Sequence, residues 1–138
     1  MPKSPFTQIV VDRTAAKIRK EIPAALAKKL PRDIAVVMVS EKVSQSLNKE
    51  YRKKDHSTNV LSFRYDDSYG ELLICFPVVR REAKEQGNTQ LFQMTWMIVH
   101  GMLHLAGLHH EKSGKTAKMS ERIEQRVLFA MMSKEAKK

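Results

Sequence analysis

The chain has 138 residues, of which 42% are hydrophobic and 29% are charged, a composition typical of one globular domain with its own core. Lys and Arg number 25 against 15 Asp and Glu, and the resulting net charge of +10 favours a polyanionic partner such as RNA or DNA. The single Cys75 excludes an intramolecular disulfide, and the absence of a long apolar segment or a signal-peptide core predicts a cytoplasmic protein without a membrane partner.

The first part of the chain predicts two strands with a broken helix between them. Residues 6–11 are rich in β-branched side chains and predict a short strand. Thr14 is a candidate cap for the helix that follows, Pro23 divides that helix, and Pro31 ends it. Residues 34–39 are apolar on both faces, which predicts a strand in the centre of the sheet.

A helix and a hairpin are expected next. Ser40 is a candidate N-cap for a helix that runs to about Lys53. Residues 60–65 and 71–76 each predict a strand, and the turn formers at residues 66–70 predict that the two strands pair as a hairpin.

The last part of the chain predicts helices. One opens at Pro77 and ends at Gly87, and Thr89 caps the next. Residues 90–106 are apolar nearly all round, which predicts a buried central helix, and residues 118–132 predict a final amphipathic helix with Met119, Ile123, Val127 and Ala130 near one face. Together the elements predict a single α+β domain over residues 1–138, in which helices cover a small mixed four-stranded sheet and the histidine-bearing helix is buried at the centre.

The strongest chemical signal is the segment HGMLHLAGLHH at residues 100–110, which holds four of the five histidines of the chain. His100 and His104 are four residues apart, so in a helix they share one face and can bind one metal ion. A histidine on an apolar helix is more often a hydrogen-bonded core residue. Several buried imidazoles would each need a polar partner, however, and their apolar neighbours offer almost none. The spacing therefore favours a metal site.

A third imidazole follows the end of this helix. Gly107 is a typical left-handed helix stop, after which the chain can turn back and bring His110 or His109 to the same ion. Three neutral nitrogen ligands with an open fourth position are typical of a catalytic zinc site, whereas structural sites are usually closed by four protein ligands. The segment predicts a metal-dependent hydrolase.

Gly101 separates this segment from a protease motif. The three histidines are spaced as in H-E-x-x-H-x-x-G-x-x-H, but Gly101 stands where the metalloproteases have the glutamate that activates water. A metalloprotease is therefore disfavoured. A glycine here permits either close helix packing or room for a substrate beside the metal.

Four segments of the chain resemble one known family. Residues 100–110 resemble the signature H-G-x-L-H-L-x-G-x-D-H of the YbeY family, and residues 47–63, LNKEYRKKDHSTNVLSF, resemble its block L-N-x-x-Y-R-x-x-D-x-x-T-D-V-L-S-F. GELLIC at residues 70–75 and REAKEQG at residues 81–87 are similar to its G-D-I-x-I-C and R-E-A-x-E-Q-G segments. The resemblance runs in order from about residue 47 to residue 128.

This resemblance implies a single-strand-specific, metal-dependent endoribonuclease that acts in maturation of the 16S ribosomal RNA 3′ end and in ribosome quality control. It implies one zinc ion held by His100, His104 and His110, and a catalytic arginine at Arg52, whose guanidinium can bind a phosphate and offset charge in the transition state. Single-stranded or ribosomal RNA is the implied partner, together with the small ribosomal subunit or assembly-factor proteins.

The chain departs from the family pattern at three aspartates, which are replaced by His109, Asn59 and Glu71. The first replacement matters most, because His109 can act as a metal ligand in place of His110 or beside it, and a fourth ligand would close the open position. The alternative function is accordingly a ribosome assembly factor that binds RNA and carries a structural zinc site with little or no hydrolysis.

Overall fold

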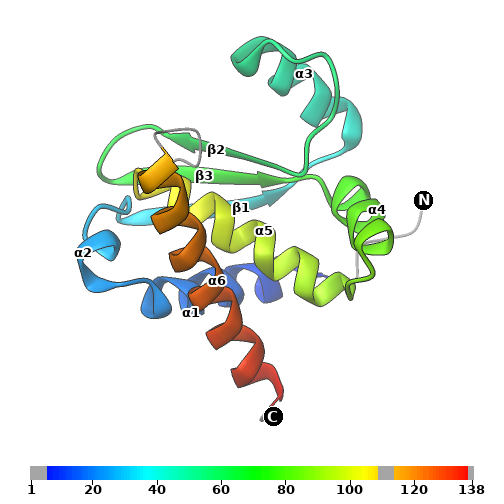
Figure 1. Ribbon diagram of the computed structural model, residues 1–138. Helices are drawn as coiled ribbons and strands as arrows, with labels where there is room; N and C mark the ends of the chain where they lie inside the picture. The colour runs from blue at the N-terminus through cyan, green and yellow to red at the C-terminus, as the bar shows by residue number, and fades with distance from the viewer. Residues whose placement is uncertain (1–5, 109–113, 137–138) are drawn as a thin grey trace.

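The computed structural model describes residues 6–108 and 114–136 and shows helices packed against a three-stranded mixed sheet (Figure 1). The elements in chain order are α1 (Gln8–Glu21), α2 (Ala24–Ala27), β1 (Asp33–Met38), α3 (Glu41–Arg52), β2 (Val60–Arg64), β3 (Tyr69–Ile74), α4 (Phe76–Gln86), α5 (Gln90–Leu105) and α6 (Gly114–Ala136). The α+β class is confirmed. The expectation of four strands is wrong, because residues 8–11 belong to a helix.

Helix α1 replaces the strand expected at residues 6–11. The Thr7 hydroxyl caps it by accepting a hydrogen bond from the Val10 N–H at 3.2 Å. Val11, Ala15 and Ile18 are buried at a spacing of four and three residues, which is the period of a helix. The β-branched run that indicates a strand therefore contributes only part of its side chains to the core, since Ile9 is 67% exposed.

The expected cap at Thr14 is also wrong. Thr14 lies inside α1, where its hydroxyl donates to the Val10 carbonyl at 2.8 Å. Pro23 does divide the helical region, since α1 ends at Glu21 and α2 begins at Ala24. Ser40 and Thr89 are confirmed as N-caps, because each side chain accepts a hydrogen bond from a backbone N–H three residues later.

The strand order is β1-β3-β2, so the first strand lies at an edge and not in the centre. Strand β1 pairs in parallel with β3, and β2 pairs with β3 in the antiparallel hairpin that the sequence predicts. The centre belongs to β3, where Leu72 and Ile74 are fully buried. In β1 only Val36 is buried. An apolar run of side chains thus does not show by itself that both faces of a strand are buried.

Helix α5 forms the middle of the core. It packs on β2 and β3 on one side and contacts α1, α4 and α6 elsewhere (Figure 1). Ten of its residues are buried, among them Ile98 and Leu103. No helix in the part of the chain that the structure describes is long and apolar enough to cross a membrane.

Helix α6 is longer than expected, and the predicted apolar face is confirmed only in part, since Val127 is buried and Ile123 packs against the core. Met119 is 52% exposed, although it belongs to the predicted apolar face. The buried side chains are Ser120, Glu124, Val127, Leu128 and Met131. A polar and an acidic side chain thus occupy the face that packs against the core, which hydrophobic periodicity could not indicate.

Candidate active site and metal centre

His100 and His104 lie on the last two turns of α5. Their ring centroids are 4.4 Å apart and their planes are tilted by 44°, so both imidazoles occupy one face of the helix as their spacing predicts. His110 and the alternative ligand His109 lie outside the described residues.

The helix ends directly after this pair. Gly107 has a φ of 92°, and its N–H donates to the His104 carbonyl at 2.9 Å. The Leu108 N–H donates to the Leu103 carbonyl, also at 2.9 Å, which completes the two-bond arrangement of a Schellman motif. Gly107 is therefore confirmed as the helix stop. Its left-handed conformation lets the N–H groups of Gly107 and Leu108 satisfy the last helical carbonyls, those of His104 and Leu103.

A buried carboxylate holds His100 from behind. Glu124 of α6 is only 5% exposed, and its Oε1 lies 2.6 Å from Nδ1 of His100. Its Oε2 accepts a hydrogen bond from Nε1 of Trp96 at 2.9 Å. When the His100 Nδ1 carries the proton of this bond, Nε2 is left as the ligand atom. Glu124 was not predicted, because hydrophobic periodicity gives no sign that an acidic residue of α6 lies on the face that packs against the core.

Gly101 is explained by close packing. A Cβ atom at this position would lie 2.8 Å from Cδ2 of Leu72 and 3.2 Å from Cγ2 of Val60. In addition, the Ser62 hydroxyl donates to the Gly101 carbonyl at 3.2 Å. A side chain at position 101 would therefore point into the sheet and not toward the space beside the histidines. Of the two readings of Gly101, the structure favours helix packing.

Arg52 lines the same cavity as the two histidines. The cavity has a volume of about 530 Å³ and is lined by Tyr51, Arg52, Thr58, Asn59, Val60, Leu61, Ser62, Phe63, His100 and His104. Arg52 is the exposed last residue of α3, far from α5 in sequence. The tertiary structure thus brings the predicted arginine and two of the predicted ligands to one hollow. None of the described residues that line it is an Asp or a Glu.

The loop between α3 and β2 is fixed by polar bonds to α3. Ser44 is buried, donates to the Thr58 carbonyl and accepts from the Thr58 N–H, both at 2.9 Å. The buried Asn48 donates to the His56 carbonyl at 2.8 Å. The amide of Asn59 donates to Glu82 at 2.8 Å. These bonds to α3 and, through Glu82, to α4 fix the loop residues Thr58 and Asn59 that line the cavity.

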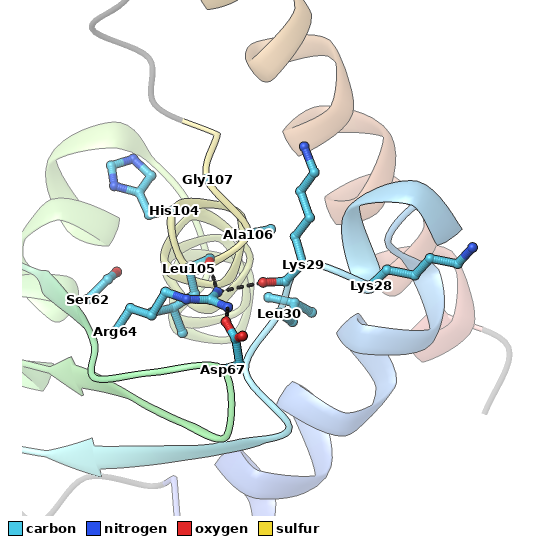
Figure 2. A pocket seen from close by; sticks show the side chains of 10 residues that line it. All are labelled: Lys28, Lys29, Leu30, Ser62, Arg64, Asp67, His104, Leu105, Ala106 and Gly107. Carbon is cyan, nitrogen blue, oxygen red and sulfur yellow. Dashed lines mark hydrogen bonds and ion pairs between the residues drawn. The ribbon is translucent and has the colours of Figure 1, made fainter.

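A second hollow, of about 680 Å³, is also lined by His104, and Figure 2 shows the side chains around it. Lys28 and Lys29 line it, and His104 and Ser62 line both hollows. Arg64 also lines this hollow, and its guanidinium donates to the carbonyls of Lys29 at 2.5 Å and Leu105 at 2.7 Å (Figure 2). Arg64, for which the sequence offers no local signal, thus ties the end of the histidine helix to the hairpin and to the turn that follows α2.

The imidazole nitrogens of His100 and His104 are suitable ligands for a divalent transition metal. Two facing imidazoles, one of them held by a buried carboxylate, have the chemistry that zinc prefers. Within residues 6–108 and 114–136 no group of three or more His, Cys, Asp or Glu side chains suited to a metal ion is present. The predicted third ligand His110 and its alternative His109 lie outside these residues, so the third ligand stays a prediction.

The chain is similar to known proteins along most of its length. A sequence model of the family described as "Endoribonuclease YbeY" matches residues 4–131. The chain is 45% identical over 121 residues to the Endoribonuclease YbeY of Aromatoleum aromaticum, which covers 86% of this chain and 77% of that protein. It is 37% identical over 132 residues to that of Delftia acidovorans, covering 94% and 84% of the two chains. The solution structure of TM1509 from Thermotoga maritima is similar with a TM-score of 0.58 and 25% identity, over 92% of this chain and 89% of that one.

Proposed function

Because the chain belongs to the YbeY family, we propose that it is an endoribonuclease that cleaves single-stranded RNA with the help of one zinc ion held by His100, His104 and His110. The observation that carries the proposal is the cavity of about 530 Å³ in which Arg52 and the histidine pair meet. Maturation of the 16S ribosomal RNA 3′ end and ribosome quality control in the cytoplasm are the proposed context, with the small ribosomal subunit or assembly factors as partners.

Each residue has a definite task in this proposal. Arg52 binds the phosphate of the scissile bond and offsets the charge that develops on it. Glu124 fixes the orientation of His100 through the bond to Nδ1, and the Schellman turn at Gly107 and Leu108 ends α5 directly after His104. A zinc ion bound there would supply a polarised phosphoryl oxygen or a water of lowered pKa.

A second function, that of an RNA-binding assembly factor with a structural zinc, is favoured by one observation. The cavity offers no carboxylate among its described lining residues, and Asn59 uses its amide to donate to Glu82. Glu82 and Glu124 line an adjoining hollow together with Asn59 and His100 and are paired with these two residues, so neither is an evident general base for this cavity. If His109 also binds the metal, its open position is lost and the site becomes structural.

Cleavage of a labelled single-stranded RNA by purified, zinc-loaded protein separates the two functions. We expect metal-dependent products that disappear in His104→Ala and fall by about 10²- to 10³-fold in kcat/KM in Arg52→Ala. Arg13→Ala removes an equally charged, exposed residue from α1 and should cleave like the wild type. RNA binding with one zinc per chain but no cleavage under any divalent metal would establish the assembly-factor function instead.

A further inference from the structure

Two aromatic rings stand at the wall of the cavity that contains Arg52 and the histidines. Tyr51 comes from the last turn of α3 and Phe63 from β2, and both line the hollow of about 530 Å³. Their ring centroids are 5.1 Å apart with planes at 69°, so the edge of one ring meets the face of the other. The pair is an ordered aromatic surface beside the proposed reaction centre.

Core packing does not account for Tyr51. The side chain is 61% exposed, whereas the buried side chains of α3 are the polar Ser44 and Asn48. Those two residues fix the helix through hydrogen bonds to the loop at Thr58 and His56. The Tyr51 ring is therefore left facing solvent at the cavity, with Phe63 packed against it.

The charges around Tyr51 favour an anionic ligand. Arg52 lines the same cavity, and Lys53 and Lys54 follow it in sequence, all three being exposed. Two acidic residues flank this stretch: Glu50 is exposed directly before Tyr51, and Asp55 lies 3.8 Å from the ammonium group of Lys49. An open aromatic ring next to a row of cations is the combination by which proteins bind single-stranded nucleic acid, since each base offers a π-face and each nucleotide a phosphate.

Tyr65 shows what an exposed tyrosine without this role looks like. It is also 61% exposed, but its ring stacks on Tyr69 with centroids 5.6 Å apart, and its hydroxyl donates to Glu71 at 2.6 Å. Tyr65 does not line the cavity. The two residues are equally exposed and differ in their polar partners: the Tyr65 hydroxyl is bound to a carboxylate, whereas Tyr51 shares its cavity with the guanidinium of Arg52.

We propose that Tyr51, supported by Phe63, stacks on a base of single-stranded RNA next to the phosphate that Arg52 binds. The inference rests on the proposed function in that it takes RNA as the ligand, and it adds a base-binding subsite to the cavity. In a duplex both faces of each base are already covered by neighbouring bases, so such a subsite selects single strands.

Binding of two RNA probes tests the subsite. The first probe is a fluorescein-labelled single-stranded RNA, and the second has the same backbone with abasic residues, so that it keeps the phosphates and loses the stacking faces. Both are titrated with the full chain in excess EDTA, which prevents metal-dependent cleavage. We expect Tyr51→Leu to bind the first probe roughly 5- to 150-fold more weakly and the abasic probe unchanged.

Matched variants make the result specific. Tyr51→Phe keeps the ring and should restore wild-type binding, while Tyr65→Leu removes an equally exposed tyrosine outside the cavity and should have no effect. Equal binding of the first probe by Tyr51→Leu and the wild type would overturn the stacking subsite, as would an equal loss for both probes.

Arg52→Ala distinguishes failure of the stacking subsite from failure of the proposed function. If it weakens binding while Tyr51→Leu does not, only the subsite is wrong. If neither variant changes the affinity, RNA does not use this cavity and the proposed function fails as well.

Discussion

At the scale of single residues, Glu124 does more for the site than its place in the sequence suggests. It is one of few acidic side chains that the structure buries in the described part of the chain, and it accepts from Trp96 Nε1 while it pairs with His100 Nδ1. Burying a carboxylate is costly unless its oxygens have partners, and here both of them do. The same two bonds that stabilise the carboxylate also orient an imidazole at the cavity.

Replacing Glu124 should therefore lower stability. Glu124→Gln keeps the shape but removes the charge and presents an NH₂ group to one of the two ring donors, so we expect a loss of about 1–3 kcal/mol in the free energy of unfolding. Urea denaturation followed by Trp96 fluorescence measures this. Glu121→Gln, at an exposed position of the same helix, is the control and should change stability by less than about 0.5 kcal/mol. Equal stability of the two variants would contradict the role assigned to Glu124.

At the scale of elements, α3 is held in place by polar contacts. Besides Ser44 and Asn48, its first residue Glu41 receives two hydrogen bonds from the guanidinium of Arg81 in α4, at 2.7 and 2.9 Å. The hydrogen bond from Arg81 is the main cause that lowers the pKa of Glu41 below its ordinary value of 4.5. The helix that carries Tyr51 and Arg52 is thus positioned by a paired carboxylate at its other end.

The Glu41–Arg81 pair predicts a pH dependence. Because the folded-state pKa of Glu41 is lowered, the pair contributes stability above pH 4.5 that is lost as the pH falls through the lowered value. Both side chains are about half exposed, so the contribution at neutral pH should be less than about 1 kcal/mol. Chemical denaturation of the wild type and Arg81→Ala should show a difference at pH 6–7 that shrinks below pH 4.5 and closes once the pH is below the lowered pKa of Glu41. Arg80→Ala is the control for lost positive charge, and a difference that persists at low pH would exclude the pair as its source.

At the scale of the whole molecule, two hollows meet at His104 and both have cations on their walls. Arg52 lines the first hollow and Lys28 and Lys29 line the second, while the net charge of the chain is +10. A strand of RNA bound along this surface would release counterions in proportion to the phosphates it contacts, which makes binding sensitive to salt.

The salt dependence should separate charge contacts from stacking. For single strands the slope of log K against log salt is about −0.7 per neutralised phosphate, so Arg52→Ala should make the slope shallower by roughly 0.7 to 1. Tyr51→Leu should lower the affinity at every salt concentration and leave the slope unchanged, because stacking releases no counterions. Affinities measured in EDTA at several salt concentrations give both slopes. An unchanged slope in Arg52→Ala would show that Arg52 makes no phosphate contact.

Much of the fold and part of the site follow from neighbours in the chain. The caps at Ser40 and Thr89, the hairpin of β2 and β3, the helix stop at Gly107 and the shared face of the two histidines were all predicted correctly. Each depends on contacts within a few residues, or on the fixed geometry of a helix or a turn, so the local sequence is sufficient.

Other features were decided only by tertiary packing. The apolar run of residues 9–11 satisfies a strand pattern, but Val11 is buried together with Ala15 and Ile18 once α1 packs on the core. Strand β1 lies at the edge because β3 takes the central position, and Gly101 is needed because α5 approaches Leu72. In each case the deciding contact is with a residue distant in sequence, which local periodicity does not contain.

The same division holds for the site. The sequence by itself determined the histidine spacing, the family pattern and the positive charge, because these are properties of residue type and order. Only the tertiary structure placed Arg52 and Tyr51 on the cavity of the histidines and brought Glu124 from α6 to His100. Such contacts between residues distant in sequence depend on tertiary packing, because the position of one helix relative to another depends on how all their buried side chains fit together.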